Sequence, residues 1–216
     1  MEHGRHLRDD VTIVSLLAGA LSASVAFLVL AALVALGATR GIDLATTLAL
    51  QSFASDQLDV LVNWHTLLGQ LAVTLPVAAL LAAVAWRRYG GWAWLAPLAI
   101  LATGAVELVF KLGLVHPGPP EELTRDLFNP LGVRVEAPSS FPSGHMARVT
   151  FLAVLVAGMF PSRAAWLGAA AFVAVAVFAR VYIGDHWISD VAGGLALGAA
   201  VAAAAIRWMH ATRTRR

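Results

Sequence analysis

Three short segments of the chain combine histidines, cations and a carboxylate, and each segment borders a strongly apolar stretch. The first contains Lys111 and His116-Pro117-Gly118-Pro119, the second reads Pro142-Ser143-Gly144-His145, and the third contains Arg180, His186 and Asp190. Polar groups are costly at the ends of membrane-length apolar segments, so such a cluster indicates a functional site. Cations, a His-Asp pair and the start of a helix are together suited to binding and transferring a phosphoryl group.

His186 and Asp190 are four residues apart, which places them on one face of a helix. A carboxylate that accepts from one imidazole nitrogen fixes the tautomer of the ring. The other nitrogen is then free to attack an electrophile or to take up a proton. A purely structural pair that caps a helix would have the same spacing, but Arg180, six residues earlier, favours the catalytic interpretation.

Two cations at the ends of apolar segments could hold a phosphate. The planar fork of Arg180 matches two phosphate oxygens at once, although an arginine at this position could also extend to the membrane interface. Lys111 follows Glu107 by one helical turn, so it could form an ion pair with this residue. A phosphate contact is an equally good interpretation of Lys111.

The second segment begins an apolar stretch and contains a helix-capping pattern. Ser143 is a good N-cap, and Gly144 lets the backbone approach a ligand closely. The free N–H groups of the first helical turn would then face a phosphate. His145, just inside the helix, could protonate a leaving oxygen.

The sequence gives no indication of a metal site. Cysteine is absent, which removes disulfides and thiolate ligands, and no His-x-x-Glu or similar ligand spacing occurs. Cations occupy the positions in the cluster where a metal ion would bind. We therefore expect neither a metal nor another cofactor.

The composition indicates a membrane protein. Of its 216 residues 59% are hydrophobic and 13% are charged, whereas soluble domains carry roughly 25% charged residues. The net charge of +2 does not indicate a nucleic-acid partner. We expect one all-α membrane domain, residues 1–216, with six transmembrane helices near 11–38, 60–86, 92–115, 144–160, 164–183 and 187–208. Gly194 and Gly198 predict close helix packing in the sixth span.

The placement of arginines predicts the orientation of the bundle. Nine of them precede the first span, follow the sixth, or lie in the links between spans two and three and spans four and five: Arg5, Arg8, Arg87, Arg88, Arg163, Arg207, Arg213, Arg215 and Arg216. The positive-inside rule assigns this side to the cytoplasm. The three chemical segments meet on the opposite side. We therefore expect a protein of the bacterial inner membrane with its site facing the periplasm or exterior.

Residues 116–142 form the longest link on that outer side and hold six of the nine prolines, which predicts a loop. This outer loop could cover the site or admit a lipid, or it could be an ordinary connection. Within it, residues 121–128 could form a short interfacial helix, with its leucines and phenylalanine on the apolar side.

These residues together resemble the type 2 phosphatidic acid phosphatase family, the membrane branch of a superfamily that also includes vanadium haloperoxidases. The second motif of the family, Pro-Ser-Gly-His, is intact at Pro142–His145. Its third motif, Ser-Arg-x5-His-x3-Asp, is matched from Arg180 to Asp190, with Ala179 in place of the serine. The resemblance covers roughly residues 60–208 and includes the six-span layout.

The first motif of the family, Lys-x6-Arg-Pro, is only partly matched. Counting from Lys111 puts Gly118 at the arginine position. Another cation would then have to compensate, and Arg148 is the first candidate because it follows His145 on nearly the same helical face. The further candidates are His116, Arg125 and Arg134.

The resemblance implies a role for each matched residue. His186 would attack phosphorus and form a phosphohistidine, Asp190 would orient His186, and His145 would protonate the leaving lipid oxygen. The phosphate oxygens would be held by Lys111, Arg180 and the backbone of Ser143 and Gly144. The scheme stabilises transition-state charge with these groups and uses no metal.

The function that we expect is hydrolysis of a phospholipid or polyprenyl (di)phosphate at the outer face of the membrane. Candidate substrates are undecaprenyl diphosphate, phosphatidylglycerol phosphate and phosphatidate. A lipid phosphotransferase would use the same phosphohistidine, so the sequence does not separate it from a hydrolase. A non-enzymatic lipid-phosphate binder or transporter with a degraded site is the alternative from another class.

Overall fold

The computed structural model describes residues 3–127 and 137–212, with side chains from residue 15 onward. Arg134, Arg213, Arg215 and Arg216 lie outside the described residues. Within this part of the chain the structure is helical, and the one β-type contact is an isolated bridge between His116 and Ser139. The prediction of an all-α fold is confirmed.

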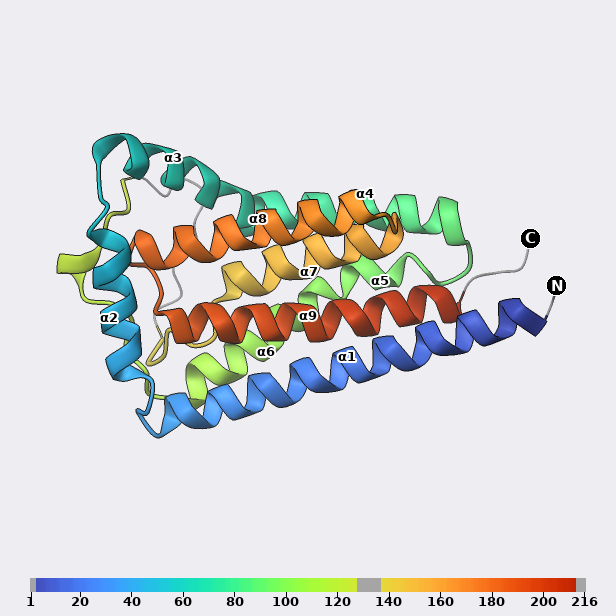
Figure 1. The fold of residues 1–216 in the computed structure, drawn as a ribbon, viewed down its shortest axis with the longest axis horizontal. Helices are drawn as coiled ribbons and strands as arrows, with labels where there is room; N and C mark the ends of the chain where they lie inside the picture. The colour runs from blue at the N-terminus through green and yellow to red at the C-terminus, as the bar shows by residue number, and fades with distance from the viewer. Residues whose placement is uncertain (1–2, 128–136, 213–216) are drawn as a thin grey trace.

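The described elements follow one another as helices joined by short turns, except for the long link between α6 and α7 (Figure 1). They are α1 (His3–Ala35), α2 (Arg40–Gln51), α3 (Asp56–Thr66), η1 (Leu67–Gly69), α4 (Leu71–Tyr89), α5 (Leu95–Leu98), α6 (Ile100–Gly113), η2 (Glu121–Leu123), α7 (Gly144–Met159), α8 (Arg163–Tyr182) and α9 (Ile188–Ala211). The elements η1 and η2 are single 3-10 turns.

Five segments of the described chain are long and apolar enough to cross a membrane. They are Ser15–Ala35, Leu71–Tyr89, Leu95–Gly113, Arg163–Tyr182 and Ile188–Ala211. The remaining predicted span corresponds to α7, which is apolar but has only 16 residues. The chain is therefore a polytopic membrane protein, with one helix of the bundle shorter than the others.

Two predicted helices have different bounds in the structure. The predicted span 60–86 is wrong at its start, because residues 60–66 belong to α3 and the 3-10 turn η1 separates α3 from α4. Asp59 and Asn63 on α3 are buried polar residues that bind the outer loop at Arg125, so α3 packs against this loop and is not part of the span. The predicted helix over 121–128 is a single 3-10 turn, because the N–H of Arg125 donates to the carbonyl of Ile183. Residue 128 lies outside the described part.

The centre of the bundle is formed by α9. About 67% of the most apolar stretch of α9 is buried within the protein, whereas the corresponding share in the other four spans is 17–28%. A methyl group added at Gly194 or Gly198 would overlap the backbone of α7. The prediction that these glycines permit close packing is confirmed.

This contact also sets the depth of the site. The start of α7 lies level with Gly194, because the carbonyl of Ser143 is the nearest group to a side chain added there. Gly194 is six residues beyond Ile188, the first residue of α9, and six residues of helix rise by about 9 Å. The first turn of α7 therefore lies deeper in the bundle than the first turn of α9.

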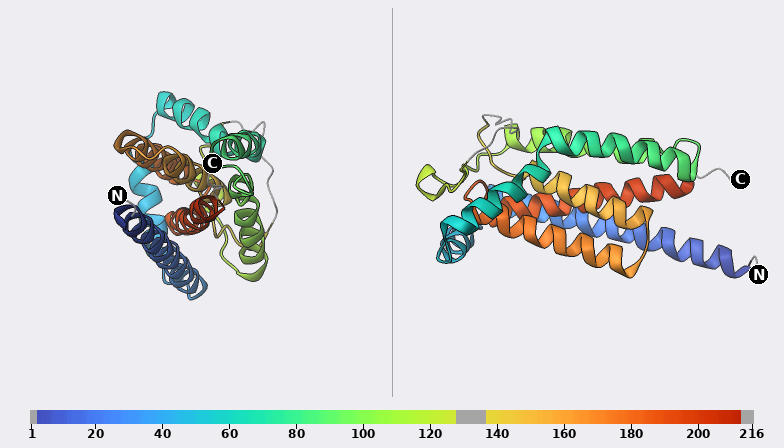
Figure 2. Two further views of the ribbon diagram at one scale, coloured as in Figure 1. Left: turned by 90° about the vertical axis from the view of Figure 1, so that its right-hand side faces the viewer. Right: turned by 90° about the horizontal axis from the view of Figure 1, so that it is seen from above.

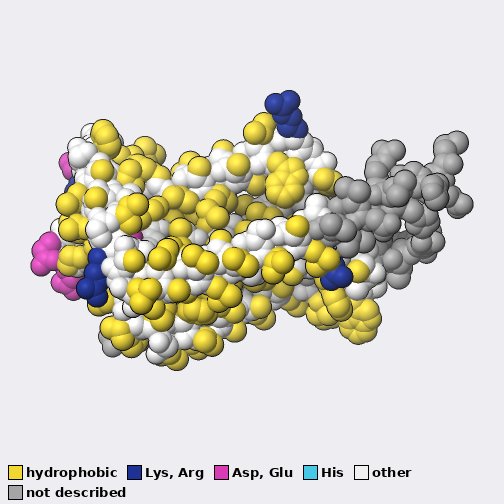
Figure 3. All heavy atoms as spheres, turned by 60° about the horizontal axis from the view of Figure 1, so that its bottom comes forward, with side chains coloured by type: hydrophobic (Ala, Val, Ile, Leu, Met, Phe, Trp, Pro, Cys, Tyr) yellow, Lys and Arg dark blue, Asp and Glu magenta, His cyan; other side chains and the backbone are white. Residues whose placement is uncertain are grey.

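The two ends of the bundle differ. Both termini lie at one end, whereas α2 and α3 lie at the other (Figures 1 and 2). The described arginines Arg87, Arg88, Arg163 and Arg207 lie in or beside helix ends that point toward the termini. Hydrophobic side chains cover the middle of the face in Figure 3, and acidic side chains gather at the end away from the termini.

Candidate active site

A cavity of about 330 Å³ lies where the starts of α4 and α7 meet the ends of α6 and α8. Its polar and charged lining residues are Thr66, Gln70, Glu107, Lys111, Glu121, Thr124, Ser139, Ser140, His145, Arg148, Arg180, Asp185 and His186. A larger cavity of about 560 Å³ lies between α1, α5 and α9, but its lining is apolar except for Ser24 and the Trp208 ring nitrogen. Only the first of these two cavities carries groups that can do chemistry.

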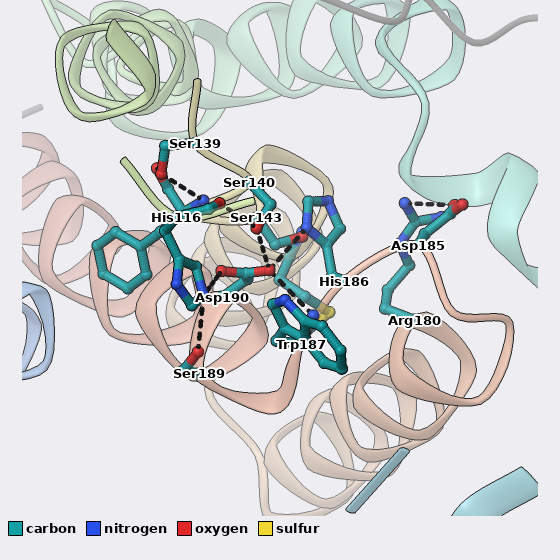
Figure 4. A network of polar contacts seen from close by, with 12 residues as sticks. His116, Ser139, Ser140, Ser143, Arg180, Asp185, His186, Trp187, Ser189 and Asp190 are labelled. Carbon is teal, nitrogen blue, oxygen red and sulfur yellow. Dashed lines mark hydrogen bonds and ion pairs between the residues drawn. The ribbon is translucent and has the colours of Figure 1, made fainter. Parts of the chain in front are cut away.

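His186 and Asp190 come together, but not on one face of a helix as predicted, because His186 lies in the turn before α9. The Nδ1 atom of His186 lies 3.4 Å from Asp190 Oδ2, which is longer than an ordinary hydrogen bond. Asp190 is fully buried, and its Oδ2 also accepts from Ser140 Oγ at 2.8 Å and from the backbone N–H of Trp187 at 2.9 Å. Figure 4 shows these groups converging on the carboxylate. The contact at Nδ1 leaves Nε2 of His186 as the nitrogen available for attack.

The start of α7 is capped as predicted. Ser143 is the N-cap, and its hydroxyl accepts from the N–H of Met146 at 3.4 Å. Its own N–H donates to the carbonyl of Asp190 at 2.9 Å, so the start of α7 is tied to α9. The cavity lining includes Gly144 and His145 but not the buried Ser143.

His145 lies deep in the cavity wall. A methyl group added at Gly69 would overlap its imidazole, so the turn η1 packs directly over the ring. Its Nε2 atom has no hydrogen-bond partner among the described residues. A buried nitrogen without a partner at the edge of a polar cavity is suited to exchange a proton with a bound ligand.

The three cations of the cavity each face a carboxylate. Arg180 is 8% exposed and its Nη2 lies 2.7 Å from Asp185 Oδ2, while its Nε has no partner among the described groups. Lys111 Nζ lies 2.8 Å from Glu107 Oε1, as one of its two interpretations predicts. Because Lys111 also lines the cavity, the ion pair does not exclude a phosphate contact.

Arg148, the first candidate to compensate for Gly118, also lines the cavity. Its Nη1 lies 3.4 Å from Glu107 Oε2, and its Nε donates to the carbonyl of Gly69 at 3.3 Å. Gly118 lies in the same lining. Gly118, which stands at the arginine position of the first motif, and Arg148 therefore line the same cavity.

Two of the other candidate cations, His116 and Arg125, lie outside the cavity lining. His116 is not part of the cavity lining, and its Nε2 lies 3.3 Å from Asp190 Oδ1. Arg125 forms a two-pronged ion pair with Asp59, at 2.9 and 2.8 Å, outside the lining. The hydrogen bond from Arg125 lowers the pKa of Asp59, and Asp59 in turn raises the pKa of Arg125.

The first part of the outer loop, residues 116–127, is held in place by polar contacts. The side-chain amide of Gln51 donates to the carbonyls of Leu123 and Tyr182, at 2.7 and 2.8 Å. The amide of Asn63 donates to the carbonyl of Arg125 at 3.0 Å. Seven described residues of the outer loop line the cavity, namely Gly118, Pro119, Glu121, Thr124, Ala137, Ser139 and Ser140. The loop thus forms one wall of the cavity.

The sequence analysis did not identify three acidic groups of this region. Glu107 was considered only as a partner of Lys111, but it contacts both Lys111 and Arg148. Asp43 on α2 accepts from Ser189, and Asp59 on α3 anchors the outer loop. Only Glu107 carried a local signal, which was its spacing of one helical turn from Lys111. Among the described residues, no group of three or more histidine or acidic side chains is arranged to hold a metal ion.

Comparison with known proteins agrees with the all-α membrane fold. The chain resembles the crystal structure of a transmembrane PAP2-type phosphatidylglycerolphosphate phosphatase from Bacillus subtilis. The TM-score is 0.74 at 23% sequence identity, and the match covers 92% of this chain and 99% of the other. No curated protein matches the chain. The family model described as the PAP2 superfamily matches residues 92–214, which include all three chemical segments, and the chain therefore belongs to the PAP2 superfamily.

Proposed function

We propose that the protein is a lipid phosphate phosphatase that works through a phosphohistidine on His186. The observation that carries this proposal is the position of the His186–Asp190 pair beside a cavity that three cations and His145 also line. A nucleophile, an orienting carboxylate, a proton donor and an anion-binding wall are the groups that phosphoryl transfer requires.

The proposed reaction has two steps. In the first, Nε2 of His186 attacks phosphorus, the bond between phosphorus and the leaving oxygen breaks, and His145 gives its proton to that oxygen. In the second, His145 takes a proton from water as the water oxygen attacks the phosphohistidine. The phosphorus–nitrogen bond then breaks, which releases inorganic phosphate and restores neutral His186.

The cations stabilise the charge that develops on the phosphoryl oxygens. The Nε atom of Arg180 has no partner among the described residues, so Arg180 can donate to a phosphate oxygen without leaving Asp185. Lys111 and Arg148 are held side by side by Glu107. The backbone at Gly144 adds the positive end of α7. We propose that Arg148 supplies the contact for which Gly118 has no side chain.

A lipid is the substrate class that fits the position of the site. The cavity adjoins the ends of helices that are long and apolar enough to cross a membrane, so an acyl or isoprenoid tail can stay in the bilayer while its phosphate enters. The structural relative is described as a phosphatidylglycerolphosphate phosphatase, which makes this lipid the first substrate to test. Undecaprenyl diphosphate and phosphatidate are the others. We place the site on the periplasmic side of a bacterial inner membrane.

Phosphate release from these three lipids by purified protein in detergent tests the function. Each assay is run with and without chelator, with His186→Ala as the inactive variant and His210→Gln as the control at the opposite end of the bundle. We expect release by the wild type and the control, unaffected by chelator, and none by His186→Ala. Radiolabelled phosphorus should remain on the quenched wild type in an acid-labile, alkali-stable form.

The same assay separates the alternatives. Loss of release in chelator, restored by a divalent ion, would rule out the metal-free scheme. Release that requires an added lipid or sugar acceptor would identify a phosphotransferase. Binding of the lipids by the wild type without release or labelling would leave a lipid-phosphate binder.

A further inference from the structure

A second imidazole contacts the carboxylate that orients His186. His116 Nε2 lies 3.3 Å from Asp190 Oδ1, on the side of the carboxylate away from His186 (Figure 4). His116 is 5% exposed and Asp190 is fully buried, so water does not separate the two groups. The phosphoryl-transfer scheme gives His116 no part.

The neighbours of His116 determine where its proton lies. Its Nε2 atom is also 3.4 Å from Ser189 Oγ. Ser189 Oγ donates its hydrogen to Asp43 Oδ2 at 3.0 Å, and the N–H of Ser189 donates to Asp43 Oδ1 at 3.0 Å. The serine oxygen therefore presents a lone pair to His116. Because both neighbours of Nε2 are acceptors, this nitrogen carries a hydrogen.

The two oxygens of Asp190 differ in their contacts. Oδ2 has three partners, namely His186, Ser140 and the N–H of Trp187. Oδ1 has no well-aligned hydrogen bond among the described residues, and its one ion-pair contact there is the 3.3 Å approach of His116 Nε2. A fully buried carboxylate oxygen without a donor is unfavourable. His116 thus holds the second oxygen and, with it, the plane of the carboxylate.

His116 is itself fixed by the chain around it. Its N–H donates to the carbonyl of Pro138 at 3.2 Å, and its carbonyl accepts from the N–H of Ser140 at 2.8 Å. Ser140 is also the residue whose hydroxyl donates to Asp190 Oδ2. The same short bridge between the two ends of the outer loop therefore places the Ser140 hydroxyl at one oxygen of Asp190 and the His116 ring at the other.

We propose that His116 is a positioning residue for the reaction, and that the orienting unit is a chain of five groups: Asp43, Ser189, His116, Asp190 and His186. Asp43 directs the hydroxyl of Ser189, Ser189 and Asp190 fix the tautomer of His116, and His116 fixes the carboxylate that orients His186. This assignment rests on the proposed function of His186. It also gives His116 a role different from that of a phosphate-binding cation.

Two substitutions of His116 separate positioning from packing. His116→Leu fills similar space without a donor, whereas the side-chain amide of His116→Gln can put an N–H near the place of Nε2. Side chains that orient a reacting group through a hydrogen bond, without contacting the substrate, typically contribute about 10- to 100-fold to activity. We expect His116→Leu to lower kcat by at least about tenfold with KM within about twofold, and His116→Gln to recover kcat to within about threefold of the wild type. His210→Gln should behave as the wild type.

A second measurement does not depend on turnover. Nitrogen NMR of protein carrying isotope-labelled histidine reports which ring nitrogen of His186 is protonated. We expect the Nδ1-protonated form in the wild type, a mixture of forms in His116→Leu, and the wild-type form in His116→Gln. If His116→Leu does not fold, Ser189→Ala provides the same two measurements, because Ser189 contacts the same ring nitrogen of His116 as Asp190 does. We expect this variant to lose less kcat than His116→Leu.

The outcomes are distinct. Wild-type kcat and an unchanged His186 signal in His116→Leu, or equal losses in the leucine and glutamine variants, would overturn the positioning role. If the wild type releases no phosphate, the proposed function is overturned. If the His186 signal nevertheless changes in His116→Leu and recovers in His116→Gln, the contacts from His116 through Asp190 to His186 still hold.

Discussion

The carboxylate of Glu107 lies against Gly144 at the first turn of α7, so close that a methyl group on Gly144 would overlap it. The same carboxylate contacts Lys111 and Arg148. A negative group surrounded by two cations and a helix N-terminus occupies a place that is favourable for any anion. Glu107 therefore shows where a phosphate oxygen would be stabilised, and a bound phosphate would compete with it for the same cations.

Glu107→Gln should strengthen the binding of inorganic phosphate. The substitution removes the negative charge that Lys111 and Arg148 now share, so both cations become available to the ligand. Charge-assisted contacts are worth roughly 1.5–3 kcal/mol, and we expect the inhibition constant of phosphate to fall by about tenfold. Glu122→Gln, at an exposed position outside the cavity lining, is the matched control. An unchanged inhibition constant in Glu107→Gln would contradict the competition.

Asp190→Asn should reduce kcat by several orders of magnitude while the protein stays folded. The amide keeps the shape of the side chain but disturbs the tautomer of His186, and an equivalent change in a catalytic triad costs about 10⁴-fold. The measurement is kcat together with the unfolding temperature in detergent. A variant that retains more than about a tenth of the wild-type kcat would show that Asp190 does not orient the nucleophile.

Arg148→Ala should lower kcat/KM by at least about tenfold, because it removes the cation that we assign to the place of the missing arginine. Gly118→Arg should partly rescue this loss. A Cβ atom added at Gly118 meets only Ser140 among the described residues, at ordinary van der Waals distance, so a side chain can start there without a clash. The double variant is compared with each single variant. An Arg148→Ala protein with unchanged kcat/KM would leave Arg148 as a partner of Glu107 alone.

Cysteine labelling should place the site outside the cytoplasm. The chain contains no native cysteine, so a single introduced thiol gives an unambiguous signal. Glu122→Cys in the outer loop should react with an impermeant reagent in intact cells, because Arg87, Arg88, Arg163 and Arg207 lie at the opposite end of the bundle, which the positive-inside rule assigns to the cytoplasm. Ala211→Cys, at the end of α9, should react only after the cells are opened. The reverse pattern would overturn the proposed orientation.

The ion pair between Asp59 and Arg125 should stabilise the protein at neutral pH and lose its effect in acid. The folded-state pKa of Asp59 lies below its ordinary value because Arg125 donates two hydrogen bonds to it. This contribution is complete above the unfolded pKa of about 3.9 and disappears as the pH falls through the folded pKa. Asp59→Asn should therefore unfold at a lower temperature than the wild type at pH 7, and the difference should shrink below about pH 4. A difference that is constant with pH would show that the charge of Asp59 does not hold the loop.

The sequence determined those features that depend on local spacing. The sequence placed Ser143 before an apolar stretch, where it caps a helix, and the spacing of four residues brought His186 near Asp190 although His186 lies in the turn before α9. The long apolar segments imply membrane spans because the bilayer sets their length. Gly194 and Gly198 indicated close packing because small residues at this spacing remove the bulk that keeps helices apart.

The tertiary structure decided the contacts between residues far apart in the chain. His116 and Asp190, Asp43 and Ser189, and Asp59 and Arg125 meet only because the helices and the outer loop pack in one arrangement. Polar contacts of this kind leave no periodic pattern in either segment. Each helix makes its own backbone hydrogen bonds, so its sequence does not show which distant side chain it will contact. The contact at Gly69 is of the same kind: a side chain there would overlap the imidazole of His145, which lies on another helix, α7.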